Sequence, residues 1–247
     1  MVTKKHDASE NKAHSAAKEA RPDGRKPDEM RDLKIEVGVI DRANGSAYVE
    51  FGNTHVIAAV YGPSTVHPRH LEDSQKAVLM CKYNMIPFSV NDRKKPGYDR
   101  RSIEISKVIK EALEPAIFLE EFPKTMINVE MEVIQADAGT RVTALTAAAV
   151  ALADAGIPMR DLVSAVAAGR ANGKIVVDLT KEEEDADDAV DMPMALMPNS
   201  GKISLLQMDG DASAEEIHQI IDMSKKVCLE IYEKQKEALK KKYKIAE

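Results

Sequence analysis

Apolar and polar residues alternate in three consecutive segments that follow the first thirty residues. The segments are IEVGVI (35–40), SAYVEF (46–51) and THVIAAVYG (54–62). A period of two is typical of strands that bury one face. The dipeptides Asn44-Gly45 and Gly52-Asn53 separate the segments, and both favour tight turns. The pattern therefore predicts an antiparallel meander of three strands.

Further apolar runs of strand length follow in the rest of the chain. They lie at 79–90, 126–134, 162–168, 174–179, 192–198 and 202–209. Three other segments have helical spacing instead, at 105–113, at 140–155 and from Ser213 onward. Pro115 is expected to end the first helix, and Ser213 with Glu216 forms a capping box that opens the last. This order of elements predicts an α+β fold with mixed β-sheets packed with α-helices.

The chain divides into a polar tail and one long ordered region. Residues 1–20 are rich in Ala and Lys without a coherent apolar face, so we expect a disordered N-terminal tail. Residues 21–247 are long enough for a single domain with its own core. The repeated use of strands followed by a helix suggests two similar halves, at about 21–155 and 156–247.

Composition indicates a globular protein and not a membrane-spanning or disulfide-rich one. Hydrophobic residues make up 44% and charged residues 31%, and no apolar run approaches the roughly 20 residues that span a bilayer. Two cysteines, Cys81 and Cys228, are too few for a disulfide scaffold and fit a reducing, cytoplasmic setting. The net charge of −6 argues weakly against a nucleic-acid binder, but a basic cluster at 93–101 leaves room for a local phosphate-binding groove.

Seven of the ten residues from Glu182 to Asp191 are acidic, directly before an apolar strand. A solvated loop is one interpretation of such a run. The alternative is a functional site formed by Asp185 and Asp191, which lie at the two ends of a short loop. Asp191 lies directly before the strand. A carboxylate held there has a raised pKa or binds a cation, so the pair could hold Mg²⁺ or protonate a leaving oxygen.

Two short motifs at helix starts indicate an anion. Arg100-Arg101-Ser102 precedes a helix, where the positive end of the helix dipole disfavours arginines unless an anion is bound. Gly139-Thr140-Arg141 opens the apolar second helix directly after a strand, so free amides, a hydroxyl and a guanidinium could donate to phosphate. Surface arginines in the first case and a plain strand–helix turn in the second are the alternatives.

A third basic segment, YGPSTVHPRH (61–70), follows the third predicted strand. It contains Arg69 between two histidines. No further Cys or His has ligand spacing, so we do not expect a metal site there. A basic loop that contacts a polyanion and an idle surface loop both remain open.

Taken in order, these motifs resemble the RNase PH family of 3′→5′ exoribonucleases. Within that family the chain is most similar to the catalytic ring subunits of archaeal exosomes. The resemblance extends from residue 21 to about 240, and it is carried by RPDGRKPDEMR, FGNTHVIAAVYGP, DRRSIEISKVIKEALEP, QADAGTR, ALADAGIPMRDLV and the pair Asp185…Asp191-Met-Pro.

The resemblance implies a fold, a reaction and an assembly. The fold is RNase PH-like, of the ribosomal protein S5 domain 2 type. The reaction is degradation of single-stranded RNA to nucleoside diphosphates, with inorganic phosphate as co-substrate, and it runs backwards to add tails. The assembly is a hexameric ring of three heterodimers with a related inactive subunit, capped by RNA-binding subunits.

The resemblance also assigns roles to residues. Asp185 and Asp191 are the catalytic carboxylates and the ligands of Mg²⁺ or another divalent metal. The phosphate-binding residues are Gly139, Thr140, Arg141 and Arg101, and the RNA-binding residues are Arg100, Arg101 and Arg69. A non-catalytic ring subunit that only threads RNA is the main alternative, and the acid pair argues against it. A small-molecule kinase is a weaker one, because the chain lacks a glycine-rich ATP loop.

Overall fold

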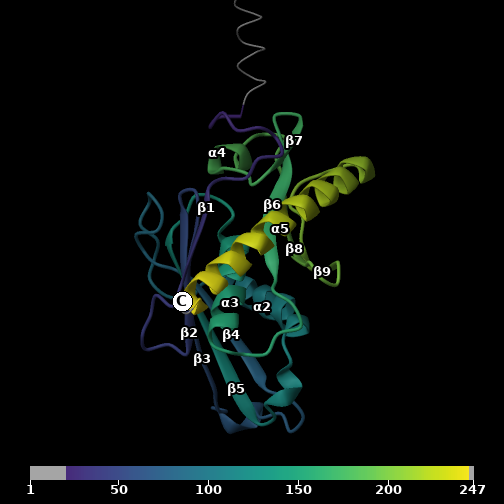
Figure 1. Cartoon of the computed structure of the whole chain (residues 1–247). Helices are drawn as coiled ribbons and strands as arrows, with labels where there is room; N and C mark the ends of the chain where they lie inside the picture. The colour runs from purple at the N-terminus through teal and green to yellow at the C-terminus, as the bar shows by residue number, and fades with distance from the viewer. Residues whose placement is uncertain (1–20, 245–247) are drawn as a thin grey trace, which may run out of the picture.

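The computed structural model describes residues 21–244, which form two β-sheets with helices between and around them (Figure 1). The first sheet has five strands in the order β1-β2-β3-β5-β4. Its strands are β1 (Leu33–Val37), β2 (Gly45–Phe51), β3 (Thr54–Thr65), β4 (Val78–Met85) and β5 (Thr125–Gln135). The first three strands form the predicted antiparallel meander, whereas β4 runs parallel to β5.

The second sheet has four antiparallel strands in the order β7-β6-β8-β9. Its strands are β6 (Ser164–Ala171), β7 (Lys174–Val177), β8 (Val190–Met197) and β9 (Lys202–Leu206). The middle strands β6 and β8 are buried along almost their whole length. This explains why their sequences are mostly apolar and do not alternate.

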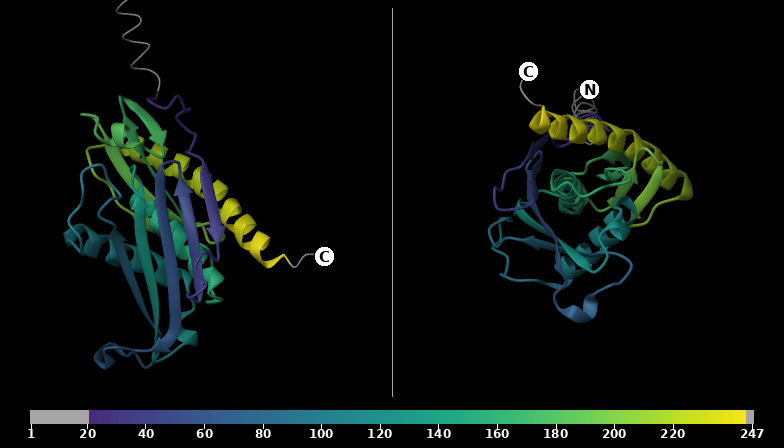
Figure 2. Two further views of the ribbon diagram at one scale, coloured as in Figure 1. Left: turned by 90° about the vertical axis from the view of Figure 1, so that its left-hand side faces the viewer. Right: turned by 60° about the horizontal axis from the view of Figure 1, so that its bottom comes forward.

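One helix, α3 (Thr140–Asp154), lies between the sheets (Figure 2). It packs against β2, β3 and β5 on one side and against β6 on the other. A helix surrounded in this way must be apolar all round, and α3 is built largely of Ala, Val and Leu. Its buried apolar residues belong to one hydrophobic cluster that continues from β2 to the last helix, so the two sheets share a core.

Two further long helices cover the outside of the molecule. The helix α2 (Arg100–Leu113) packs on β4 and ends before Pro115, as predicted. The helix α5 (Ala214–Tyr243) crosses β6 and β1 (Figure 1). Its predicted capping box is present, because Glu216 N–H donates to Ser213 Oγ and Ser213 N–H donates to Glu216 Oε2. In the described part of the chain, no helix combines the length and apolar character needed to cross a membrane.

The structure corrects several predicted boundaries. Strand β1 covers 33–37 where the sequence predicted 35–40, and β4 ends at Met85 where the prediction ran to residue 90. The largest difference lies in the acidic run, which was predicted as a loop. Its first four residues form a short helix, α4 (Lys181–Glu184), and three single-turn 3-10 helices, η1 (Arg69–Leu71), η2 (Glu114–Ala116) and η3 (Leu119–Glu121), were not predicted.

The predicted tail, residues 1–20, lies outside the described residues. The division into two similar halves stays a prediction, although each half contributes one of the two sheets.

Candidate active site

Residues 137–141 connect β5 to α3 and include the first two residues of that helix. They are called the anion loop here, because backbone amides at the start of a helix can bind an anion. Gly139 is the N-cap of α3 in the left-handed conformation, with φ of 61°, and no side chain caps the helix. A Cβ at Gly139 would come within 3.3 Å of Arg31 Nη2. Both observations favour glycine, and the first amides of α3 are left to bind an anion.

Thr140, the first residue of α3, is held by a buried tyrosine. Tyr83 on β4 is fully buried, and its hydroxyl donates to Thr140 Oγ1 over 2.8 Å. Burial raises the pKa of Tyr83, while Arg101 and Arg141 oppose that shift, so both arginines lie near this hydroxyl. Since Thr140 Oγ1 accepts from Tyr83, its own proton is free to point toward a ligand.

Arg141 is held by two residues that no sequence motif singles out. Its Nη1 donates to Gln207 Oε1, and its Nη2 lies 3.5 Å from Glu104 Oε2. Gln207 also donates to the other oxygen of Glu104 over 3.1 Å, so the two acceptors support each other. Among the described residues, Arg141 Nε is buried without a hydrogen-bond partner. A buried, unsatisfied guanidinium donor is the group that an oxyanion would satisfy.

Residues 181–191 are called the acidic segment, and they face the anion loop through Glu184. Thr180 caps α4 with a capping box that includes Glu183, which is only 1% exposed. The backbone N–H of Gly139 lies close enough to the carboxylate of Glu184 to oppose a rise in its pKa. Burial first, and then the charge of Asp191, raise the pKa of Glu184 to about 6. The sequence alone does not distinguish Glu184 from its acidic neighbours.

Asp191 is the second residue of β8 and is fixed on both sides. It pairs with Gly169 of β6 and exchanges two backbone hydrogen bonds with Asp209, at 2.9 and 2.8 Å. A Cβ at Gly169 would lie 1.7 Å from the carbonyl oxygen of Val190, so only glycine lets β6 approach here. In the described region, Asp191 Oδ1 is buried without a hydrogen-bond partner.

The surroundings of Asp191 place it beside the predicted arginines. Burial raises its pKa, the charge of Asp209 adds to that increase, and Arg141 and Arg101 oppose it. The largest opposing charge is Arg141. The carboxylate of Asp191 and the guanidinium of Arg141 therefore act on one another across the same site, each with an unsatisfied buried atom.

Asp185 is not brought into this arrangement. It is the C-cap residue of α4, its side chain is 63% exposed, and it accepts from Lys181 Nζ over 2.5 Å. An exposed pair of this kind is an ordinary helix-surface contact. The structure thus places one predicted carboxylate at the site, with Glu184 beside it, and the other at the surface.

Arg100 and Arg101 lie at the first turn of α2. The helix is capped by Asp99, which accepts from Ser102 N–H over 2.7 Å, and this bond lowers the pKa of Asp99 to about 2. The carboxylate of Asp99 thus supplies part of the negative charge that was expected at the start of this helix. Both arginines are exposed, and the charge of Arg101 acts on Tyr83, Glu184 and Asp191.

Arg69 lies far from these residues. It begins the 3-10 helix η1 after β3, where Thr65 pairs with Thr125 at the start of β5. The anion loop follows the other end of β5, which has 11 residues, so about 30 Å separates the two ends. Arg69 is exposed, and its predicted role in RNA binding concerns a different part of the molecule.

The residues fit a divalent metal only in part. Among residues 21–244, no group of three or more His, Cys, Asp or Glu side chains could hold a metal by itself. The unsatisfied Oδ1 of Asp191 is one suitable oxygen ligand. Mg²⁺ commonly takes one or two carboxylates and completes its shell with waters and substrate phosphates. Asp191 therefore fits as a ligand that shares the ion with a phosphate-bearing substrate.

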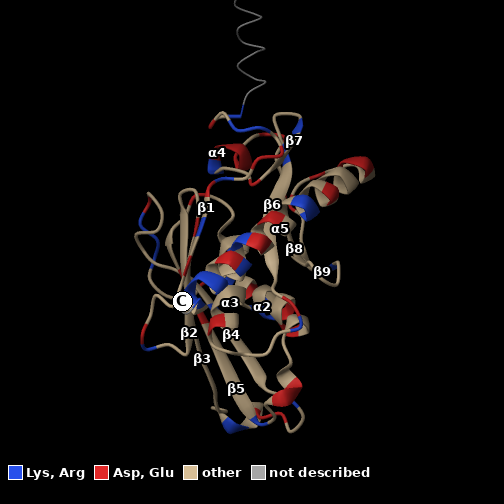
Figure 3. Ribbon diagram, in the orientation of Figure 1, with Lys and Arg blue, Asp and Glu red and all other residues tan. Residues whose placement is uncertain are grey.

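Together these groups form a small site with opposite charges on its two sides. The anion loop and Arg101 supply donors for an oxyanion, and Asp191 and Glu184 supply carboxyl groups with raised pKa values. Figure 3 shows the acidic residues of α4 close to basic residues of the N-terminal segment. Such a site can bind a phosphate group and move a proton at one of its oxygens.

Comparison with known families identifies this class of protein. A model described as "3' exoribonuclease family, domain 1" matches residues 29–158, and one described as "3' exoribonuclease family, domain 2" matches residues 161–227. The chain therefore belongs to the RNase PH family of 3′ exoribonucleases. The α+β RNase PH fold and the exoribonuclease class predicted from the sequence are confirmed.

The relatives narrow the class further. The exosome complex component Rrp41 of Pyrococcus abyssi is 59% identical over 90% of this chain and 89% of its own length, and that of Methanopyrus kandleri is 58% identical over 90% and 93%. Rice Rrp46 has a similar structure, with a TM-score of 0.80, 25% identity, and coverage of 89% of this chain and 100% of its own. The Archaeoglobus fulgidus exosome with RNA bound to the active site contains a chain with the same fold, with a TM-score of 0.75, 23% identity, and coverage of 92% of this chain and 98% of that one.

Proposed function

We propose that this chain is the catalytic subunit of an archaeal exosome, a phosphorolytic 3′→5′ exoribonuclease that releases nucleoside diphosphates from single-stranded RNA. The observation that carries the proposal is the pairing of Arg141 with Asp191, each with a buried, unsatisfied atom and each acting on the other's charge. A subunit that only threads RNA does not need an unpaired carboxylate beside an oxyanion pocket.

In the proposed reaction, inorganic phosphate binds at the Thr140 amide and hydroxyl, at the Arg141 guanidinium, and at the Gly139 amide, where it replaces the Glu184 carboxylate. Arg101 neutralises the scissile phosphodiester, and Arg100 holds the adjoining backbone. An oxygen of the phosphate attacks the phosphorus of the last linkage, the bond from that phosphorus to the 3′ oxygen breaks, and a nucleoside 5′-diphosphate leaves. Positioning and charge stabilisation dominate catalysis of this kind.

Asp191 provides the proton that the departing 3′ oxygen needs. Its burial keeps its pKa above the ordinary range, so it holds a proton more readily than an exposed aspartate does. The reverse reaction uses the same carboxylate as a base, so excess nucleoside diphosphate extends the RNA. Asp185 is proposed to contribute only if it leaves Lys181, because the two side chains are paired in this structure.

As the alternative to proton donation, Asp191 is proposed to bind a divalent metal, with Mg²⁺ as the first candidate and with Asp185 or Glu184 as a second carboxylate ligand. When bound, such an ion neutralises charge on phosphoryl oxygens. The proposal is supported by the unsatisfied Asp191 Oδ1 and by the closeness of Glu184, whose charge repels that of Asp191 unless a cation lies nearby.

The names of the relatives support an assembly. They are exosome components, and the Rrp46 structure has the same fold, so we propose a ring built with other RNase PH-type subunits. Three heterodimers with a related inactive subunit, RNA-binding caps and Arg69 as an RNA contact within the ring remain predictions. A cytoplasmic location is likewise a prediction, in line with two free, buried cysteines.

Product identity tests the function. The chain, alone and assembled with its ring partner, is incubated with single-stranded RNA, Mg²⁺ and radiolabelled orthophosphate. We expect label in the terminal phosphate of nucleoside diphosphates, and the reaction should stop without phosphate. Nucleoside monophosphates without label would indicate hydrolysis, and no release by the assembled ring would favour the RNA-threading alternative.

A further inference from the structure

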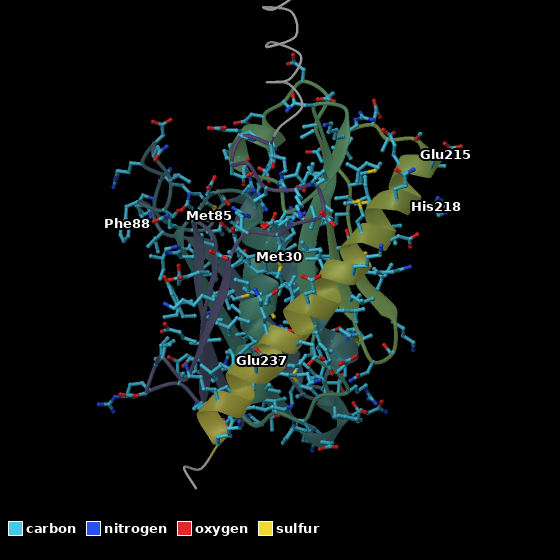
Figure 4. All side chains as sticks on the ribbon, turned by 45° about the horizontal axis from the view of Figure 1, so that its top comes forward. Met30, Met85, Phe88, Glu215, His218 and Glu237 are labelled. Carbon is cyan, nitrogen blue, oxygen red and sulfur yellow. The ribbon has the colours of Figure 1, made fainter. Side chains whose placement is uncertain are left out.

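The segment of residues 21–31, before β1, holds both sides of the proposed site. It has no regular secondary structure, yet Arg21 and Arg31 are each only 8% exposed. Met30 from the same segment packs against the core (Figure 4). Buried guanidinium groups are costly unless they are fully paired. Their partners therefore show what this segment keeps in place.

Arg21 holds the acidic segment. Its Nε and Nη2 donate to the two oxygens of Glu183, both over 2.8 Å, in a bidentate pair. The same guanidinium donates to the backbone carbonyls of Val177 and Asp178, both over 3.0 Å. Glu183 lies in α4 directly before Glu184. A shift of Arg21 would therefore move the helix that carries Glu184.

Arg31 holds the anion loop. Its Nε and its backbone N–H donate to Asp178 Oδ2 over 2.9 and 2.7 Å, and its Nη2 donates to Asp178 Oδ1 over 2.7 Å. Its remaining arm, Nη1, donates to the backbone carbonyl of Asp137 over 2.5 Å. The guanidinium also forms the wall against which Gly139 lies. Arg31 thus connects the end of β7 to the loop that opens α3.

Asp178 joins the two arginines. It is 2% exposed and accepts through its carboxylate from Arg31 and through its backbone carbonyl from Arg21. The acidic segment and the anion loop adjoin different sheets and are at least 40 residues apart in the chain. Both are nevertheless bonded to one short segment, of which the part before residue 29 lies outside the matched family model.

We propose that Arg21 and Arg31 are positioning residues of this exoribonuclease. Arg21 acts through Glu183 and fixes the acidic segment, and Arg31 acts through Asp178 and the Asp137 carbonyl and fixes the anion loop. Neither contacts the phosphate or the RNA. This inference rests on the proposed function, because it assigns the anion loop to phosphate and the acidic segment to the chemical step.

The two arginines should fail in different ways when each is replaced by lysine. Lysine keeps the charge but loses the planar fork that makes the bidentate contacts. In Arg21→Lys the carboxylate of Glu184 is misplaced while the phosphate pocket is kept, so kcat should fall about tenfold with the KM for phosphate within about twofold. In Arg31→Lys the anion loop is misplaced, so the KM for phosphate should rise about tenfold.

Arg25→Lys is the matched control. Arg25 lies in the same segment and donates to the backbone carbonyls of Asp178 and Glu29, both over 2.9 Å. Its contact with the Asp178 carboxylate is longer, 3.4 Å, and in the described structure it has no hydrogen bond to Glu183 or to the anion loop. Both kinetic parameters should stay within about twofold of the wild type. If Arg31→Lys does not fold, Asp178→Asn keeps the shape of the partner and should raise the KM for phosphate in the same direction.

The measurement is steady-state release of nucleoside diphosphate by the assembled ring at varied phosphate, with a thermal unfolding curve for each variant. A wild type without phosphate-dependent release refutes the proposed function itself. With an active wild type, the split between kcat and KM supports the positioning roles. Equal changes in both parameters, losses that match only the unfolded fraction, or no change overturn them.

Discussion

The anion loop and the acidic segment are both short charged motifs, but they build the site in different ways. In the anion loop the proposed donors are mainly backbone amides, because α3 has no side-chain cap, although the Gly139 N–H also faces Glu184. In the acidic segment the functional groups are side-chain carboxylates, so the direction in which each side chain points decides whether that residue lies at the site. Asp191 and Glu184 face the anion loop, whereas Asp185 faces solvent.

The difference follows from local geometry. Successive residues of a helix point about 100° apart. In α4 this rotation turns Glu183 toward Arg21, Glu184 toward Gly139 and Asp185 toward Lys181. Three adjacent acids therefore have three environments. A helix start, by contrast, presents its amides in one direction, whatever side chains surround it.

Among the acidic residues of the site, replacing Asp191 should cause the largest loss of activity. In Asp191→Asn the shape is kept but the group can no longer hold or release a proton. We expect kcat for nucleoside diphosphate release to fall by about 10²–10³. RNA affinity at moderate salt should change little, because the arginines that contact the backbone remain. An active variant would remove Asp191 from the mechanism.

Glu184→Gln and Asp185→Asn sharpen the comparison between two neighbouring acids. The folded protein raises the pKa of Glu184 from 4.5 to about 6, so in that window the folded state binds a proton that the unfolded state has lost. Stability therefore decreases as pH rises from 4.5 to 6 and stays lower above it. Removing the charge in Glu184→Gln should raise the free energy of unfolding at pH 7.5 by about 1–2 kcal/mol.

Denaturant unfolding in phosphate-free buffer checks this difference. The gain in Glu184→Gln should shrink toward zero as the pH is lowered to 4.5. Asp185→Asn is the control, because that carboxylate is exposed, and its effect should stay within about 0.5 kcal/mol. Equal shifts for the two variants, or a gain that is the same at both pH values, would contradict the assignment of Glu184.

These two regions also show how far the sequence could predict the site. Gly139, Thr140 and Arg141 were identified correctly as the start of a buried helix, because a strand, a small residue and an apolar run in succession define such a turn. Asp191 was recognised from its place before an apolar strand. The structure confirms these positions, whereas their roles in phosphate and metal binding remain proposals.

The other residues of the site could not be predicted in this way, because their positions depend on local capping and on packing between distant elements. Thr180 and Glu183 have the spacing of a capping box, and this signal could have predicted α4 and the outward direction of Asp185. Tyr83, Gln207 and Glu104 reach the site only because β4, β9 and α2 meet there in the folded chain. Nothing in the sequence around these three residues indicates that they contact the anion loop.

Tyr83→Phe tests the anion side with a smaller effect. The variant loses one buried hydrogen bond, of about 1 kcal/mol, and frees the Thr140 hydroxyl to turn away from the pocket. The KM for phosphate should rise about fivefold, with kcat nearly unchanged. Phenylalanine at this buried position keeps the ring packing. A change in kcat alone would contradict the role of Tyr83 in orienting Thr140.

Arg69→Ala should have the smallest effect on chemistry. Arg69 follows β3 near the start of β5, and the anion loop follows the other end of β5, about 30 Å along the strand. Release from a short RNA that occupies only the active site should therefore stay within about twofold of the wild type. Long RNA should bind more weakly if Arg69 contacts the strand, and competition between short and long substrates measures this. A large loss on the short RNA would place Arg69 at the site after all.

The central claim is that an oxyanion binds between the anion loop and Asp191. A crystal structure of the assembled ring with tungstate, an electron-dense phosphate analogue, tests it most directly. We predict tungstate oxygens about 3 Å from the Thr140 amide and the Arg141 guanidinium, with Asp191 across the pocket. Tungstate bound elsewhere with this pocket unoccupied, or Thr140 and Arg141 more than roughly 15 Å from Asp191, far beyond contact range, would contradict the account.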